Sequence, residues 1–302
     1  MSLLTKEADP LYAQPRAERP AYATGMLLDA QDFSDEQTYH RGRLARALAF
    51  LAGGGTLAGL EVVHVAATDT QPEEIQVNPG LAIDRLGRLV EVPRPACLRL
   101  ENWYTLIHDR DAGDTLRRCA YDNLGRFVSP RLHDSGAALP ARAVVADVFI
   151  RFAQCPVGLT PSFAAGPFDA LNAVSTARIR DAYELQLIPR DTLGDDYSGL
   201  PLPPGAAVIG NPEAGLADRR NAVQDAVLSG YAGSGHAGGS GGLAPLPEQP
   251  VDLDPSAIFL GRVFLPVGAT DPPVRSADPP LLDNWARRFL PPLALLAQWD
   301  GM

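Results

Sequence analysis

The stretch that decides the fold covers residues 25–63 and reads GMLLDAQDFSDEQTYHRGRLARALAFLAGGGTLAGLEVV. Its first half has the spacing of an amphipathic helix. Residues that share one predicted face recur at steps of three and four: Phe33, Gln37, His40, Leu44, Leu48 and Leu51. Ser34 is predicted to cap this helix, with Gln37 as its capping-box partner. The glycines at 53–55 predict the helix end, because glycine takes positive φ without steric cost. A strand is expected over residues 57–65.

The composition indicates a folded, soluble protein and excludes several classes. The chain has 302 residues, of which 46% are hydrophobic and 21% charged. Its net charge of −10 argues against nucleic acid as a partner, because phosphate binding needs a basic surface. Lys6, Glu7 and Asp9 interrupt any hydrophobic leader, and no run is long enough for a transmembrane segment. We therefore expect synthesis in the cytoplasm, with export, if any, by a route other than a signal peptide.

The chain order predicts an α+β fold, mostly β, in which an N-terminal arm and an amphipathic helix precede small antiparallel β regions with long loops. Residues 1–24 are expected to form an extended arm that lies on its own domain or docks on a neighbour. Residues 25–100 form a helix plus β-meander module, and residues 101–141 form a connector that holds one short helix. Residues 142–302 form a β-rich domain with Gly/Pro-rich loops and a C-terminal helix.

The individual strands are predicted from alternation and turn residues. We expect strands over residues 61–66, 74–77, 81–84, 88–92, 142–152, 177–189 and 258–267. Ile75, Val77, Ile83, Leu89 and Val92 are the expected inward side chains of the meander. Residues 155–175 are predicted to be a loop, residues 200–205 and 230–242 to lack regular structure, and residues 216–228 to be helical. A docking helix is expected over residues 281–299, broken by the two prolines at 291–292.

No catalytic set, metal site or cofactor is predicted. The glycine pattern at 53–58 follows a helix and opens a strand, whereas a dinucleotide fingerprint needs the opposite order. His108 and His133 each precede an aspartate, but adjacent residues do not face one another. The cysteines at 97, 119 and 155 form neither a disulfide framework nor a zinc pattern. We therefore predict that the chain is not an enzyme, with a dispersed metal site left open.

The opening stretch resembles a family of structural proteins encoded with phage-tail-like contractile injection systems. The shared pattern runs Gly-x-Leu-Leu-x-x-x-Asp-Phe-x-x-Glu-Gln-x-Tyr-x-Arg from Gly25 to Arg41, then Gly-x-x-x-Gly-Leu-x-Val from Gly55. The likeness extends to residues 77–84, 178–187 and 283–288. The tetrad AGGG at 52–55 stands where the family usually has His-Gly-Trp-Gly or a similar tetrad. Family members often have further cysteines after the position of residue 156, and these are missing here. The resemblance implies a baseplate or fibre-associated subunit that works by assembly.

This implication sets the function hypotheses. The first is a structural or adaptor subunit of a contractile particle, which can be released from the cell, with other particle subunits as partners in a homo- or hetero-oligomer. The residues expected at its partner interface are Leu3, Leu4, Tyr12, Tyr22, Phe33, Gln37, His40, Arg41 and Leu44. The second is a β-rich surface- or glycan-binding module that uses loop aromatics at 103, 104, 197 and 231. The third, less favoured, is a hydrolase built on the scattered histidines and aspartates.

Overall fold

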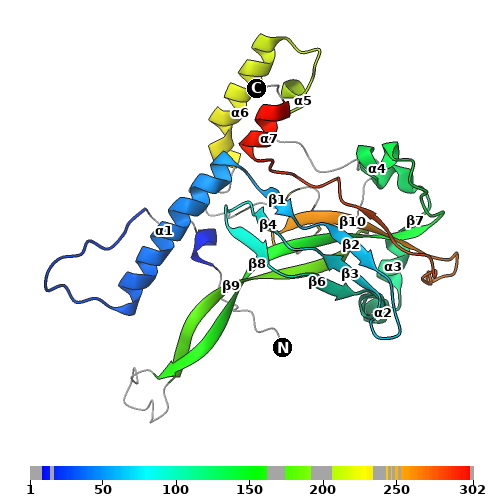
Figure 1. Ribbon diagram of the computed structural model, residues 1–302, viewed down its shortest axis with the longest axis horizontal. Coiled ribbons are helices and arrows are strands. Elements are labelled where there is room, and N and C mark those ends of the chain that lie inside the picture. Colours follow the sequence, from blue (N-terminus) through cyan, green and yellow to red (C-terminus); the bar gives the residue numbers. More distant parts are fainter. Residues whose placement is uncertain are drawn as a thin grey trace.

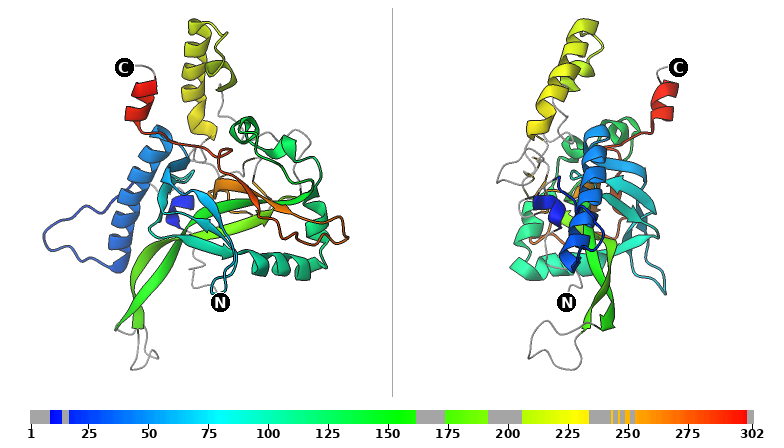
Figure 2. Two further views of the ribbon diagram at one scale, coloured as in Figure 1. Left: turned by 45° about the vertical axis from the view of Figure 1, so that its right-hand side comes forward. Right: turned by 90° about the vertical axis from the view of Figure 1, so that its left-hand side faces the viewer.

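A computed structural model provides the three-dimensional structure, which describes residues 9–13, 17–161, 174–191, 206–233, 243, 246, 249–250 and 253–299. The predicted α+β class is confirmed, and helices and strands take comparable shares of the described chain. The views show a β body with helices on its outside, and α1 runs along one edge of that body (Figures 1 and 2).

The N-terminal third supplies a short turn, one long helix and two small sheets. After η1 (Pro10–Ala13), α1 covers Ala30–Leu51. One antiparallel sheet has the order β1–β4–β5, with β1 at Gly55–Gly59, β4 at Gly80–Ile83 and β5 at Leu89–Val92. The other has the order β2–β3–β6, with β2 at Val62–Val65, β3 at Glu74–Val77 and β6 at Ala96–Arg99.

The predicted strand over residues 57–65 and the single meander are corrected by these two sheets. The chain breaks between β1 and β2 because Gly59 and Leu60 take φ of +63° and +58°. These two positive φ values turn the backbone out of one sheet and into the other, while the Leu60 side chain stays fully buried. Of the expected inward residues, Leu89 is wrong, since it is exposed, and the other four are buried.

Short helices follow β6 and cover the connector. α2 spans Leu100–Asp111, α3 Asp114–Arg118, β7 Ala120–Tyr121, η2 Leu124–Phe127 and α4 Pro130–Asp134. α2 confirms the expected short helix, and its Leu100 and Ile107 are buried in the main core. The proposed boundaries at residues 100 and 141 stay predictions, but side chains on both sides of them share this core.

The largest sheet is antiparallel and is built on two long strands. Its path is β11–β10–β8–β7, with β9 paired to β8. β8 covers Ala143–Pro161, β9 Val174–Pro189, β10 Ile258–Pro266 and β11 Leu281–Asp283. The loop predicted from residue 155 is wrong as far as Pro161, because the pairing of β8 with β9 continues to Pro161↔Val174. Beyond the sheet, this pair extends away from the body as a ribbon (Figure 1).

The described part of the C-terminal half also includes three helices. α5 covers Ala206–Ile209, α6 Leu216–Gly233 and α7 Leu293–Trp299. α6 confirms the helix expected at 216–228. It continues to residue 233, so the glycine tract predicted to lack regular structure is helical at its start. The rest of that tract and residues 200–205 lie outside the described residues. The docking helix expected from residue 281 is wrong up to the prolines. Residues 281–283 instead pair with β10, and the helix starts after Pro292.

Candidate docking surface

Helix α1 carries a continuous row of solvent-exposed residues, which we call the outer stripe. It consists of Phe33, Gln37, His40, Leu44, Ala47 and Leu51. Phe33 is 51% exposed, Leu44 61% and Leu51 86%. At 1.5 Å per residue the stripe is about 27 Å long. Large apolar side chains that lie in water along one face of a helix indicate a surface made to be covered.

The opposite side of α1 is held against the body by close backbone packing. Ala45 is the buried residue of this helix. It lies over the β4–β5 turn, where a Cβ on Gly87 would come within 1.7 Å of the Ala45 carbonyl oxygen. Gly87 also has φ of +85°. Small residues therefore form the inner face, and the larger side chains of the outer stripe point elsewhere.

The start of α1 is fixed by Asp29 rather than by Ser34. The Asp29 side chain accepts hydrogen bonds from the backbone N–H groups of Gln31 and Asp32, and the Asp32 carboxylate accepts one from the Asp29 N–H. This is a complete capping box. The prediction of Ser34 and Gln37 is corrected: the helix begins one turn earlier, and Gln37 stands on the outer stripe.

The arm lies on its own domain at residues 9–12, which decides between the two alternatives for that part of the chain. Asp9 is buried and accepts hydrogen bonds from Arg88 Nη1 at 3.1 Å and Arg41 Nη2 at 3.0 Å. The Tyr12 hydroxyl donates to Asp254 Oδ1 at 2.6 Å. We call these five residues the arm clamp. It joins the arm, α1, the β4–β5 turn and the segment before β10.

The charges of the arm clamp are tuned by burial and by hydrogen bonds. Arg88 lies against the Tyr12 ring, 4.8 Å from its centroid, and donates through Nε to Asp84 at 2.7 Å. Burial raises the pKa of the Asp84 carboxyl. Burial also tends to raise the pKa of Asp254, but hydrogen bonds from Tyr12 and Ser256 outweigh it and lower that pKa. The clamp therefore holds a buried arginine among paired acids.

The residues predicted for a partner interface fall into three groups. Phe33, Gln37, His40 and Leu44 lie together on the outer stripe. Tyr22 is exposed beside them, and its hydroxyl donates to Glu36. Leu3 and Leu4 lie outside the described residues. The side chains of Tyr12 and Arg41 belong to the arm clamp, and Arg41 keeps 37% of its side chain exposed beside its contact with Asp9.

Two features of the surface escape the sequence pattern. Leu48 was expected on the same face as Leu44 but is half-buried, and Ala47 is exposed in its place. Leu27, which precedes the helix, is 94% exposed and continues the apolar surface. The three- and four-residue spacing places Ala47 on this face, but an alanine is too small to stand out in a pattern of large hydrophobic residues.

A second candidate surface is a polar cleft of about 780 Å³ between the β2–β3 turn, α2 and the segment before β11. Glu73 lies in it, accepts a hydrogen bond from Arg275 Nη2 at 2.5 Å and contacts His64 Nε2 at 2.7 Å. The bond from Arg275 is the main cause that lowers the pKa of Glu73, against a smaller opposing effect of burial. Tyr104 also lines the cleft, and burial raises its pKa to about 12.

The aromatics predicted for a glycan site are only partly placed at this cleft. Trp103 donates its indole N–H to the Leu187 carbonyl oxygen at 2.7 Å and packs on the main core. Tyr104 donates its hydroxyl to Pro273 O at 2.9 Å. Tyr197 and the side chain of Tyr231 lie outside the described residues. Of the two aromatics that the structure describes, Tyr104 lines the cleft and Trp103 does not.

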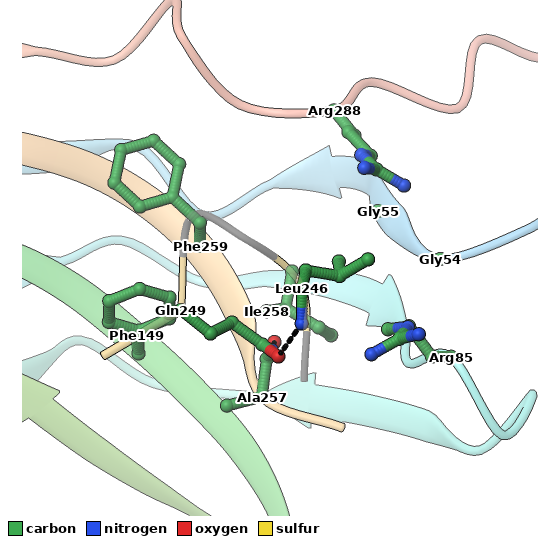
Figure 3. Close-up of a pocket in the computed structure, with 10 residues that line it drawn as sticks. All are labelled: Gly54, Gly55, Arg85, Phe149, Leu246, Gln249, Ala257, Ile258, Phe259 and Arg288. Atoms are coloured by element: carbon green, nitrogen blue, oxygen red, sulfur yellow. Dashed lines mark hydrogen bonds between the residues drawn. The ribbon is translucent and has the colours of Figure 1, made fainter. Parts of the chain in front are cut away.

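A small pocket lies next to the glycine turn that follows α1 (Figure 3). Phe149 and Phe259 form one side of it, with ring centroids 5.7 Å apart, and Arg85 and Arg288 stand at the other. The Leu246 backbone N–H donates to Gln249 Oε1 at 2.8 Å. The cavity measures about 30 Å³, which holds about one water molecule.

The histidines predicted for a hydrolase stay apart. His108 and His133 each contact the adjacent aspartate, at 3.2 and 3.5 Å, so the expectation that adjacent residues do not face one another is wrong at both positions. Both side chains are exposed. Among the residues that the structure describes, no three histidine, cysteine or acidic side chains are grouped to hold a metal ion. Within the same described part of the chain, none of the helices has the length and apolar character needed to cross a bilayer.

Comparisons with known proteins give distant likenesses among solved structures. No family model and no curated protein matches the sequence. Among solved structures, the crystal structure of TssK matches with 12% sequence identity and a TM-score of 0.27. The match covers 80% of this chain and 66% of that chain, so the chain spans just under two thirds of its length. A likeness at this TM-score carries no argument about function.

Proposed function

We propose that this chain is a structural or adaptor subunit of a contractile phage-tail-like particle, in the baseplate or fibre-attachment region, and acts by protein–protein assembly. The observation that carries the proposal is the outer stripe of α1, which exposes Phe33, Leu44 and Leu51 on a helix whose Ala45 is buried against the body. The resemblance of residues 25–63 to proteins of such particles supports the setting, since the stripe lies within that stretch.

The arm clamp supports the same proposal, because an assembly surface gains affinity when its supports are ordered beforehand. Arg41 ties α1 to Asp9, and Arg88 ties Asp9 to the β4–β5 turn. The stripe is thereby presented in one orientation. Removal of residues 1–24 would also remove Asp9 and Tyr12 from the clamp, so a stripe substitution tests assembly more cleanly than truncation of the arm.

The test uses a tagged chain in cells that produce the particle. We expect the wild-type chain to be found in purified particles and Leu44→Glu to be absent from them, because a charge cannot be buried in an apolar contact without a partner. Leu106→Glu is the matched control, since Leu106 is an equally exposed leucine of another helix, 68% against 61% for Leu44. Particles that lack the wild-type chain, or that hold Leu44→Glu at wild-type amounts, would contradict the proposal.

We also propose that the chain has no catalytic activity, and that it joins the particle after synthesis in the cytoplasm. The exposure of His108 and His133, each beside one acid, supports the first part. Elemental analysis with no stoichiometric ion agrees with it. A hydrolase activity that disappears in His108→Ala or His133→Ala would overturn it.

A second candidate function is glycan binding at the polar cleft. Its size of about 780 Å³ and its polar lining, which includes Thr68, Thr70, Gln71 and Ser276, suit a hydroxyl-rich ligand. A glycan array with the intact chain tests this candidate. A hit that Glu101→Ala removes and Leu106→Glu keeps would support it, and no binding at high micromolar concentration would exclude it.

A further inference from the structure

We infer that the occupant of the outer stripe is a second copy of this chain, packed in parallel on α1 as a short coiled coil. The inference rests on the proposed function and names the partner of the same surface. It follows from the spacing of the stripe, from its polar members and from the charges that flank it.

The spacing is that of a coiled-coil seam. From Phe33 to Leu51 the stripe residues are separated by four, three, four, three and four positions, an alternation that repeats every seven residues as in a coiled coil. In heptad terms Phe33, His40 and Ala47 take one core position, and Gln37, Leu44 and Leu51 take the other. The body does not use this seam, because every one of its residues is exposed while Ala45 faces the body.

The polar members of the seam favour a symmetric, parallel pair. Gln37 and His40 are exposed, and each carries a donor and an acceptor when the imidazole is neutral. Around a two-fold axis parallel to α1 each of them meets its own counterpart, so an amide can pair with an amide and an imidazole with an imidazole. The antiparallel register that overlaps the whole stripe would place Gln37 against Ala47 and His40 against Leu44, neither of which offers a partner for a hydrogen bond.

The charged residues beside the seam favour the same direction. In a parallel pair Glu36 lies opposite Arg41 of the second copy, and this happens on both sides of the axis. The Glu36 side chain keeps 36% of its surface exposed beside its contacts with His40 and Tyr22, and the Arg41 side chain keeps 37% beside its contact with Asp9. The antiparallel register that overlaps the whole stripe would instead bring Arg43 to Arg43 and Arg41 to Arg41, which is repulsive.

The two helices of such a pair would meet at the edge of the molecule. α1 runs along this edge in Figure 1, where the segment before it loops outward beside the helix, and the side view in Figure 2 faces the same edge. A seam of about three heptads is short, and helices of this length are marginal in water on their own. Because α1 is already formed and fixed on the body, pairing costs less ordering, and a reversible, concentration-dependent association is expected.

The first experiment is sedimentation velocity of the purified full chain over a wide concentration range. We expect the wild-type chain and Leu106→Glu to associate equally, and Leu44→Glu to dissociate at least tenfold more readily. A wild-type chain that stays monomeric at every concentration would overturn the inference. So would a Leu44→Glu chain that associates as strongly as wild type.

The second experiment fixes the direction of the pair with cysteine cross-links in a Cys97→Ser background, which removes the exposed native thiol. Ala47→Cys should form a disulfide-linked dimer on mild oxidation, because residue 47 meets its own counterpart in a parallel pair. In an antiparallel pair, Ala47→Cys would cross-link only when mixed with Gln37→Cys, and that result would overturn the parallel arrangement.

The two proposals fail separately. If the wild-type chain is monomeric in solution but Leu44→Glu is lost from particles, the stripe binds another subunit, so the second copy is wrong and the particle role stands. If the chain pairs through the stripe but is absent from particles, the particle role is wrong and the pairing stands.

Discussion

In the β body, charged groups are buried and paired, whereas on the outer face of α1 large apolar groups are exposed. Asp147 is fully buried and accepts hydrogen bonds from Arg262 Nε at 2.7 Å and Nη2 at 2.9 Å. Leu51, by contrast, keeps 86% of its surface in water. Each region departs from the usual distribution of residues, and each departure needs its own partner.

The difference lies in where those partners come from. The body supplies its own: Arg262 and Arg190 both reach Asp147, and Ser129 donates its hydroxyl to the buried Asp283. The described chain supplies no cover for Leu44 or Leu51, and our proposal assigns this cover to another molecule. Under the proposal, charge in the body serves folding and the apolar surface on α1 serves assembly.

The largest effect is expected from a substitution that removes a buried charge partner in the β body. Asp147→Ala leaves Arg262 and Arg190 buried without their shared carboxylate. Loss of one partner from a buried pair costs about 3–5 kcal/mol of unfolding free energy. Urea denaturation followed by circular dichroism measures this loss. Asp114→Ala, which removes an exposed partner of Arg118, serves as the control and should unfold like wild type.

A smaller loss is expected where α1 meets the body. Gly87→Ala places a Cβ 1.7 Å from the Ala45 carbonyl oxygen at φ of +85°. Strain and overpacking together should lower the unfolding free energy by about 2–3 kcal/mol. Gly136→Ala is the control, because Gly136 has φ of +69° but a Cβ added there would meet no atom within 4 Å, so strain alone remains. Equal losses for the two variants would show that α1 does not press on this turn.

The arm clamp should contribute less again and should respond to pH. Tyr12→Phe removes the hydroxyl that donates to Asp254, at a cost of about 1.5 kcal/mol in unfolding free energy. Because the pKa of Asp254 is lowered in the fold, its contribution is present above the unfolded pKa of about 4 and is lost as pH falls through the folded value. The difference between wild type and Tyr12→Phe should therefore shrink in acid.

Taking the difference between wild type and Tyr12→Phe also cancels a contribution from Asp84, which has the opposite pH dependence to that of Asp254. Burial raises the pKa of Asp84, so protonation of Asp84 increases the unfolding free energy as pH falls. This contribution is the same in wild type and in Tyr12→Phe. Urea titrations of both at neutral pH and near pH 3 give the difference. A gap that stays constant or widens in acid would mean that Tyr12 does not act through Asp254.

Local signals in the sequence predicted much of the fold. The spacing of residues 33–51 gave a helix, and the glycine run ended it at Leu51, with Gly53 at φ of +75°. The start was missed because the cap at Asp29 uses Asp32 in place of the usual glutamate or glutamine. The split into two sheets was missed because Leu60 takes a positive φ that its residue type does not predict.

The candidate site shows a different limit. A stripe of apolar residues has the same spacing whether it faces the body or the solvent, so sequence located the stripe but not its exposure. The true inner face rests on Ala45 against Gly87, two small residues without a hydrophobic signal. Likewise, residues 281–283 pair with β10 because Asp283 is held by Ser129 from far along the chain.

The smallest expected effect sharpens the α1 side of the comparison. Leu51→Gln changes the most exposed leucine of the outer stripe, so in dilute solution its unfolding free energy should stay within about 0.5 kcal/mol of wild type. At high protein concentration the wild type should gain stability by mass action, because association favours the folded state, and Leu51→Gln should gain less. Thermal melts at low and high concentration separate the two conditions. A dilute Leu51→Gln chain that melts well below wild type would place Leu51 in the fold itself, and the contrast between body and stripe would no longer hold.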